Sequence, residues 1–241
     1  MNVVALLARR ELSTYLNTPW GWAITAIILF LDGVFFNVFG LTERPQYSAE
    51  VLEQFFFYTS GLTMIAGLLL TMRLIAEERQ TGTLVLLESA PISEAQIVLG
   101  KFLGAWSFLL VLLVCTAYMP LFIMVNGKIS WAQLGVGYLG CALAGAAAVA
   151  VGTFASALAR NQLLSVVLGA ILLLALVISW FVARLTEGPL SDVLAYVAIW
   201  DKHFQPFMRG RVNTENLVYF GSTVFAFLLL STRALQARRW Q

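Results

Sequence analysis

Residues 72–104 read MRLIAEERQTGTLVLLESAPISEAQIVLGKFLG and lie between two long apolar runs. A charged group, Glu77 to Arg79, ends the first run, and Pro91 stops the leucine-bearing piece that follows. Ser93 and Gln96 have the spacing of a capping box, which marks the start of a helix. A flexible linker would favour Gly and Ser. The stretch therefore predicts a short helix, a stop, and a fresh helix that enters the next apolar run.

The composition of the whole chain excludes a water-soluble or disordered protein. Of its 241 residues, 60% are hydrophobic and 12% are charged. A soluble domain of this size could not remove so much apolar surface from water. The net charge of +2 gives no indication of nucleic acid binding. Cys115 and Cys141 both lie in apolar runs, so no disulfide framework is expected.

Several apolar runs are long enough to cross a bilayer as helices. They predict six spans, at residues 20–40, 55–74, 102–125, 132–158, 162–183 and 217–235. Lys and Arg are more numerous on the face that carries both termini and the 75–100 connection. The positive-inside rule then places that face in the cytoplasm and the 186–215 loop, with a short helix, outside.

Residues 1–18 have the pattern of an amphipathic helix. Arg9 and Arg10 share one face with other polar side chains, and Pro19 ends the helix before the interfacial Trp20. We expect an elbow helix that lies along the cytoplasmic leaflet. The alternative is an ordinary cytoplasmic start to the first span.

The fourth span carries small residues at every fourth position. They are Gly140, Ala144, Ala148, Gly152 and Ser156. Small residues at this spacing let helix backbones approach closely in lipid. We expect these residues to pack against another helix of the same chain. The alternative is that they form a dimer interface. In the third span, Pro120 is expected to kink the helix.

One motif resembles a known family. The pattern E-E-R-x-x-G-T-L-x-x-L-x-x-x-P-I-S, from Glu77 to Ser93, resembles the cytoplasmic loop of ABC-2 type transporter permeases. The resemblance extends over nearly the whole chain. The stretch DKHFQPFMRGRVNTENLVYF, from Asp201 to Phe220, and the ending Ala237–Trp240 are similar to the GldF-like subgroup, which is named for gliding motility. Motility itself is not carried over.

This resemblance implies a fold and a set of partners. The fold is an all-α membrane domain of the ABC-2 (type V exporter-like) class, with an elbow helix, six spans and a coupling helix in residues 75–100. Two separate ATPase subunits bind ATP and Mg²⁺, and the chain itself binds no cofactor. The other expected partners are a second permease copy, the lipid bilayer and a periplasmic auxiliary protein. The location is the bacterial inner membrane.

The resemblance also implies which residues contact the ATPase. They are Glu77, Glu78, Arg79, Gly82, Thr83, Leu84, Leu87 and Pro91. The charged residues would make charge-assisted contacts, Gly82 would allow close approach, and the leucines would anchor the helix in a groove. The alternative is an intramolecular salt bridge, with the short helix packed on the elbow.

Four other residues are candidates for a substrate pathway or an outer gate. Asp32 lies inside the first span, where a carboxyl group is costly. His203, Phe204 and Arg209 lie in the outer loop. For Asp32 the alternative is a hydrated or helix-paired side chain, and for the loop it is an aromatic anchor at the membrane interface. A single His without a nearby Cys indicates no metal site.

The leading functional hypothesis is the permease subunit of an ATP-driven exporter. It is not an enzyme, because GxxxxGK[ST], HExxH and GxSxG are all absent from the sequence. A non-transporting anchor that relays ATPase motion to an envelope partner is the main alternative. An ion-coupled transporter is less favoured, since the third, fifth and sixth spans have no interior carboxylate.

Overall fold

The computed structural model describes residues 3–40, 47–83, 92–126, 128–186 and 188–238. Within these ranges the regular structure is entirely helical, and six helices or helix pairs are long and apolar enough to cross a membrane. The prediction of an all-α membrane protein with six spans is confirmed. The predicted contacts of Leu84, Leu87 and Pro91 lie outside the described residues.

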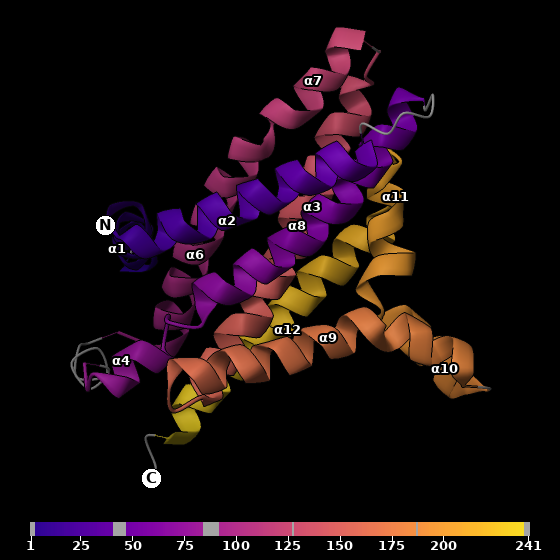
Figure 1. The fold of residues 1–241 in the computed structure, drawn as a ribbon. Coiled ribbons are helices and arrows are strands. Elements are labelled where there is room, and N and C mark those ends of the chain that lie inside the picture. The colour runs from indigo at the N-terminus through magenta and orange to yellow at the C-terminus, as the bar shows by residue number, and fades with distance from the viewer. Residues whose placement is uncertain (1–2, 41–46, 84–91, 127, 187, 239–241) are drawn as a thin grey trace.

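The helices follow the predicted order along the chain (Figure 1). They are α1 Val3–Asn17, α2 Pro19–Phe35, the π-helical turn η1 Phe36–Gly40, α3 Ser48–Thr71, α4 Ala76–Gln80, α6 Glu94–Thr116, α7 Tyr118–Asn126, α8 Trp131–Leu158, α9 Gln162–Leu185, α10 Pro189–Val197, the π-helical turn η2 Ile199–Phe204, α11 Gln205–Met208 and α12 Thr214–Arg238. Helix α3 begins at Ser48 rather than at residue 55, because its first two turns are polar and give no hydropathy signal.

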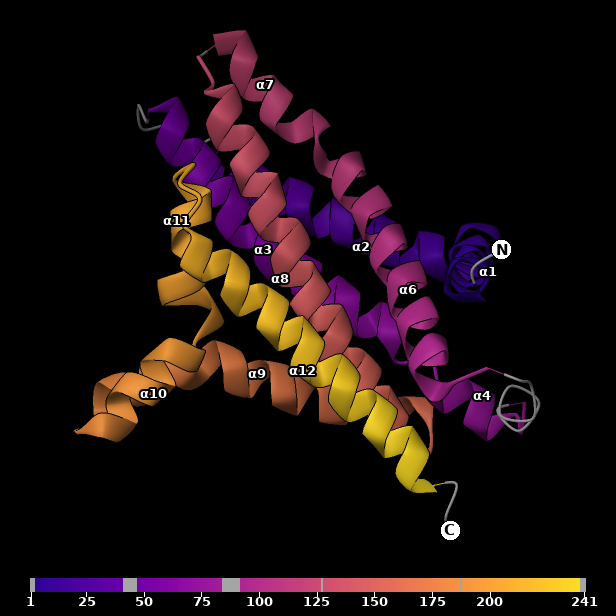
Figure 2. The same cartoon turned by 180° about the vertical axis from the view of Figure 1, so that it is seen from behind.

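The bundle is built around α8, which runs through its middle between α3 and α12 (Figure 2). All five small residues of the predicted stripe are buried. A Cβ atom on Gly67 of α3 would lie 3.4 Å from the Cβ of Ala148, and one on Gly152 would overlap the side chain of Thr71. The stripe therefore lets α3 and α8 pack backbone to backbone, which confirms the interpretation as packing within the chain.

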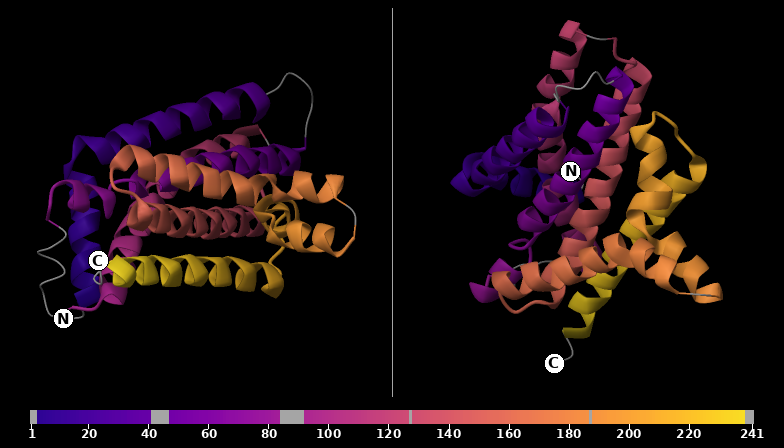
Figure 3. Two further views of the ribbon diagram at one scale, coloured as in Figure 1. Left: turned by 90° about the horizontal axis from the view of Figure 1, so that it is seen from below. Right: turned by 45° about the vertical axis from the view of Figure 1, so that its right-hand side comes forward.

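Helix α1 runs across the bundle instead of along it (Figure 3). Thr18 adopts an extended conformation between the two helices, and Pro19 occupies the first turn of α2. A proline at this position is pre-organised for a helix start and cannot continue the preceding helix. The resulting sharp bend gives α1 the orientation expected of a helix on a membrane surface.

The third span is interrupted, as its proline predicts. Helix α6 ends at Thr116 and α7 begins at Tyr118, two residues before Pro120. The ring of a proline clashes with the carbonyl four residues earlier, here that of Thr116. The Thr116 hydroxyl lies 3.1 Å from that of Tyr138 on α8, so the interrupted region is held to the bundle by side chains.

The segment from α10 to α11, which is predicted to lie outside and is here called the outer segment, differs from the sequence prediction. It contains α10, η2 and α11 instead of one short helix. The aromatic-anchor interpretation is wrong for Phe204 and Phe207, because both side chains are completely buried. They pack against Gly140 of α8, where an added Cβ would lie 2.6 Å from the Cβ of Phe207. The glycine leaves room for these rings inside the protein, which hydropathy alone could not indicate.

Candidate coupling site

Helix α4 lies at the end of the bundle that also carries α1 and the C-terminus (Figure 3). Its first turn is seated on α8. The backbone N–H groups of Ile75 and Ala76 both donate to the Ser156 hydroxyl, at 3.0 Å each. The first N–H groups of a helix have no partner within the helix, so Ser156 satisfies two of them.

Arg79 ties α4 to the same end of α8. Its guanidinium donates to the carbonyl oxygen of Ala157 at 3.0 Å and also to that of Ala159. These carbonyls lie at the C-terminus of α8, where a basic side chain is favourable both as a hydrogen-bond donor and as a charge. Arg79 therefore joins the short helix α4 to the last turn of α8 a second time, in addition to Ser156.

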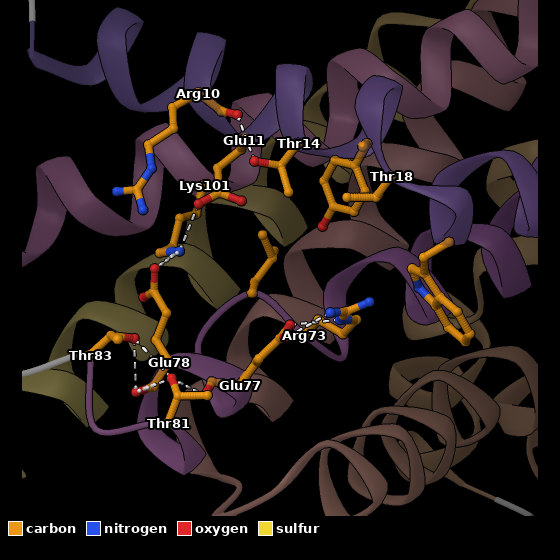
Figure 4. A pocket seen from close by; sticks show the side chains of 13 residues that line it. Arg10, Glu11, Thr14, Thr18, Arg73, Glu77, Glu78, Thr81, Thr83 and Lys101 are labelled. Atoms are coloured by element: carbon orange, nitrogen blue, oxygen red, sulfur yellow. Dashed lines mark hydrogen bonds and ion pairs between the residues drawn. The ribbon is translucent and has the colours of Figure 1, made fainter.

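Lys101 connects three helices in the same region. Its ammonium lies 2.8 Å from a carboxylate oxygen of Glu11 on α1 and 2.8 Å from one of Glu78 on α4 (Figure 4). The Lys101 side chain on α6 is only 2% exposed. A buried charge of this kind is tolerated only when it is paired and hydrogen-bonded. The triad therefore fixes α1, α4 and α6 relative to one another.

Arg73 and Glu77 form a second ion pair, within one helical turn. Two guanidinium nitrogens of Arg73 lie 2.6 and 2.5 Å from the Glu77 carboxylate oxygens. Both side chains are about one-third exposed, at 34% and 32%. An exposed pair like this one contributes only about 0–1 kcal/mol. It orients two side chains but adds little to stability.

The elbow helix is held closely against α6. Cβ atoms on Gly100 and Gly104 would each lie 2.5 Å from a Cβ of α1, on Leu7 and Glu11 respectively. The two glycines form a G-x-x-x-G pattern, the signature of close helix crossings in membranes. This pattern is visible in the sequence and is the signal from which the α1–α6 contact could have been predicted.

Tyr15 makes a further link between the elbow and the spans. Its hydroxyl donates to the backbone oxygen of Leu70 at 2.7 Å, and its ring lies 5.3 Å from that of Phe108. Burial raises the pKa of the Tyr15 hydroxyl, so the group stays protonated and remains a donor. Helix α1 is thereby attached to α3 as well as to α6.

A cavity of about 560 Å³ opens between α1 and α4 (Figure 4). The Arg10, Glu11 and Thr14 side chains line one wall, and those of Glu77, Glu78 and Thr81 line the opposite wall. The second carboxylate oxygen of Glu78 is buried and has no hydrogen-bond partner among the described residues. The elbow and α4 therefore enclose a polar space.

The predicted contact residues divide into two groups. Glu77, Glu78 and Arg79 all make contacts within the chain, as the intramolecular alternative describes. Gly82 and Thr83 lie on an exposed turn. Gly82 has a φ angle of +74°, and no atom lies within 4 Å of the position of its missing Cβ. The left-handed conformation at the end of α4 explains the glycine and leaves open space beside it.

Asp32 lies between α2 and α3 and is only 1% exposed. Its Oδ1 atom accepts a hydrogen bond from the Thr59 hydroxyl at 2.8 Å, whereas Oδ2 has no partner among the described residues. One carboxylate oxygen of Asp32 is therefore hydrogen-bonded to the neighbouring helix α3, and the other lacks a hydrogen-bond partner among the described residues.

His203 is buried in a separate location, against α12. Its ring is stacked on that of Tyr219 at 3.7 Å between centroids. Its two nitrogens lie 3.1 Å from Asn216 Oδ1 and 2.9 Å from the backbone oxygen of Tyr196. These contacts attach the outer segment to the last span. Arg209, by contrast, is exposed and donates to Glu53 of α3 at 2.9 Å. The described contacts do not join His203 to Asp32, so these candidates do not form a single site.

Together, the six spans, the crosswise helix α1 and the anchored helix α4 define a multi-pass helical membrane protein. The chain belongs to the ABC-2 family of transporter proteins, whose family model matches residues 5–191. The match includes the elbow, the α4 region and the first five spans, so it agrees with the resemblance found in the loop motif.

Two curated relatives are similar over part of the chain. A probable ABC transporter permease protein NosY from Stutzerimonas stutzeri is 34% identical over 111 residues. The NosY protein of Pseudomonas aeruginosa, described in the same words, is 33% identical over 111 residues. Each match covers 43% of this chain and 39% of the relative. The similarity therefore spans about two-fifths of each relative's length.

Proposed function

We propose that this chain is the membrane permease subunit of an ATP-driven exporter, and that a separate ATPase docks on α4 and the exposed turn at residues 81–83. The observation that carries the proposal is the connection of α4 to three other helices through Lys101, Ser156 and Arg79. A force applied to α4 would be transmitted directly to α1, α6 and α8. Motion of a docked ATPase could then shift the membrane helices between two arrangements.

The docked partner must distinguish those two arrangements, since a ligand shifts an equilibrium only by its differential affinity. ATP and Mg²⁺ belong to the ATPase in this proposal, and the permease contributes the moving helices. The family match and the naming of the NosY relatives as permeases support the assignment. The GldF-like subgroup is the finer assignment that we propose from the outer-loop motif.

The proposed assembly contains two permease copies and two ATPase copies. Only 28%, 22% and 17% of the apolar stretches of the first, fifth and sixth spans are buried within the chain. The remaining apolar side chains need lipid or another protein surface as a neighbour. This exposure supports embedding in a bilayer. We propose in addition that the embedded unit is a dimer in the bacterial inner membrane, with both termini in the cytoplasm. A periplasmic auxiliary protein would bind at the opposite end.

Co-purification with the ATPase tests the docking site. Thr83→Arg combined with Leu87→Asp should abolish capture of the ATPase, because it places a bulky charge on the exposed turn and removes an apolar anchor. Thr214→Arg is the matched control, since it adds the same side chain to an exposed threonine at the other end of the bundle. Undiminished capture by the double variant, with normal insertion, would contradict the proposal.

A further inference from the structure

A second cavity lies at the end of the bundle away from α4. It has a volume of about 420 Å³ and lies between the first turns of α3 and the η2–α11 segment. Cavities of several hundred Å³ are typical of small-molecule sites. This cavity is separate from the proposed coupling site, and the two cavities share no lining residue among those described.

The lining is acidic. Glu50, Glu53 and Asp201 contribute three carboxylates, and none of the described lining residues is Lys or Arg. Glu53 pairs with Arg209 at 2.9 Å and Asp201 with Arg184 at 3.2 Å, from outside the lining. Glu50 is exposed and makes no ion pair among the described contacts. The cavity therefore presents a net negative charge.

One wall of the cavity is aromatic. The rings of Trp200 and Phe57 lie 4.8 Å apart, inclined at 58°. Trp200 lies against Gly61, where an added Cβ would be 3.3 Å from the indole ring. The faces of aromatic rings carry negative charge density and attract cations. Carboxylates beside exposed ring faces are the surroundings that a quaternary or alkylated ammonium group prefers.

Two residues of the lining also carry a buried polar atom without a partner. Trp200 Nε1 and Gln54 Oε1 are buried without a hydrogen-bond partner among the described residues. Gln54 also lines a smaller, deeper cavity that contains Asp32, whose Oδ2 is likewise unpartnered. Buried acceptors without donors are uncommon and need an explanation. The Gln54 oxygen adds a partial negative charge at this wall of the cavity, which favours a cation over an anion there.

We propose that the cavity between α3 and η2 binds an organic cation with an alkylammonium group. Glu50 and Asp201 would face the charge, and Trp200 and Phe57 would contact the alkyl groups. A metal ion is a poorer fit, since no group of three or more His, Cys, Asp or Glu among the described residues could hold one. The proposal goes beyond the exporter function, because binding requires no ATPase.

Equilibrium binding of tetraethylammonium to the full chain tests this site. The protein is placed in nanodiscs of phosphatidylcholine without ATPase, at an ionic strength kept constant with NaCl. We expect saturable binding that Trp200→Leu weakens by roughly 3-fold to 30-fold, and that Trp200→Phe largely preserves. Glu50→Gln should also weaken binding, and it alters an exposed side chain, so folding should be unaffected.

Glu215→Gln is the matched charge control. Glu215 lies 3.1 Å from Lys202 in an exposed pair and does not line the cavity. This variant should bind tetraethylammonium as the wild type does. Absence of saturable binding by the wild type would overturn the proposal, as would an equal loss in Glu215→Gln. Displacement of tetraethylammonium by equimolar Ca²⁺ would also overturn it, by indicating a metal site.

Discussion

At the scale of single residues, Lys101 shows how a membrane protein places a charge. Two carboxylates share one buried ammonium, and the three residues come from three different helices. Removing one partner of a buried ion pair leaves a charge without compensation, which costs far more than the pair itself contributes. The stability of the end that carries α1 and α4 therefore depends on Lys101 more than on the exposed Arg73–Glu77 pair.

We expect Lys101→Met to lower the free energy of unfolding by about 3 kcal/mol, because it strands Glu11 and Glu78. Lys202→Met is the matched control, since Lys202 is about half exposed in its pair with Glu215 and should change stability by less than about 1 kcal/mol. Reversible unfolding in mixed detergent micelles measures both. Equal free energies of unfolding for the two variants would show that the Lys101 triad does not stabilise the packing of α1, α4 and α6.

For Asp32, we expect a milder result. Asp32→Asn keeps an oxygen that can accept the Thr59 hydrogen bond and replaces the unpartnered oxygen with a donor. ATP hydrolysis by the assembled complex should change little. Complete loss of activity with normal assembly would show that the carboxyl group itself is required.

At the scale of elements, glycines determine which helices meet. Gly67 and Gly152 bring α3 against α8, and Gly100 and Gly104 bring α1 against α6. In lipid the hydrophobic effect does not drive helices together, so close packing of backbones must contribute the attraction. A larger side chain at such a position has no space to occupy.

Gly152→Val should therefore separate α3 from α8 and destabilise the protein by about 1–3 kcal/mol. Gly221→Val on α12 is the matched control, because no atom lies within 4 Å of the position of its missing Cβ. Thermal denaturation in detergent, followed by size-exclusion chromatography, compares the two. The packing argument fails if Gly221→Val is the more damaging substitution.

At the scale of the whole molecule, the two proposed sites lie at different ends of the bundle. One end carries α1, α4 and the C-terminus, and the other carries α11 (Figures 1 and 3). The acidic cavity, beside η2 and α11, lies at that second end. The proposed mechanism requires these ends to face opposite sides of the membrane, because the ATPase binds at the α4 end in the cytoplasm and an exported molecule must leave at the other end.

Cysteine labelling tests this orientation. In a chain with Cys115 and Cys141 replaced by alanine, Thr83→Cys should react with a membrane-impermeant maleimide only after the cells are opened. Thr214→Cys should react in intact spheroplasts. Both threonines are exposed in the chain itself. The permease is therefore expressed without the ATPase that would cover Thr83, so that accessibility depends on the side of the membrane. Labelling of Thr83→Cys in intact cells would show that this turn faces the outside, and it would contradict the proposal that an ATPase docks there.

The sequence alone determined the features that depend on local pattern. Hydropathy marked the six spans, the Ser93–Gln96 box marked the start of α6, and Pro120 marked the break between α6 and α7. These signals arise within a few residues of one another, through capping, ring geometry and length. They need no knowledge of which helices are neighbours.

Only the tertiary structure decided which residues meet. Glu78 was expected to face a partner, yet it pairs with Lys101, and Phe204 was expected in the outer gate or at the interface, yet it is buried against α8. Both outcomes depend on how each helix is rotated and where it crosses its neighbours. A span that is apolar on all sides does not reveal its inward face, because lipid and protein interior favour the same side chains.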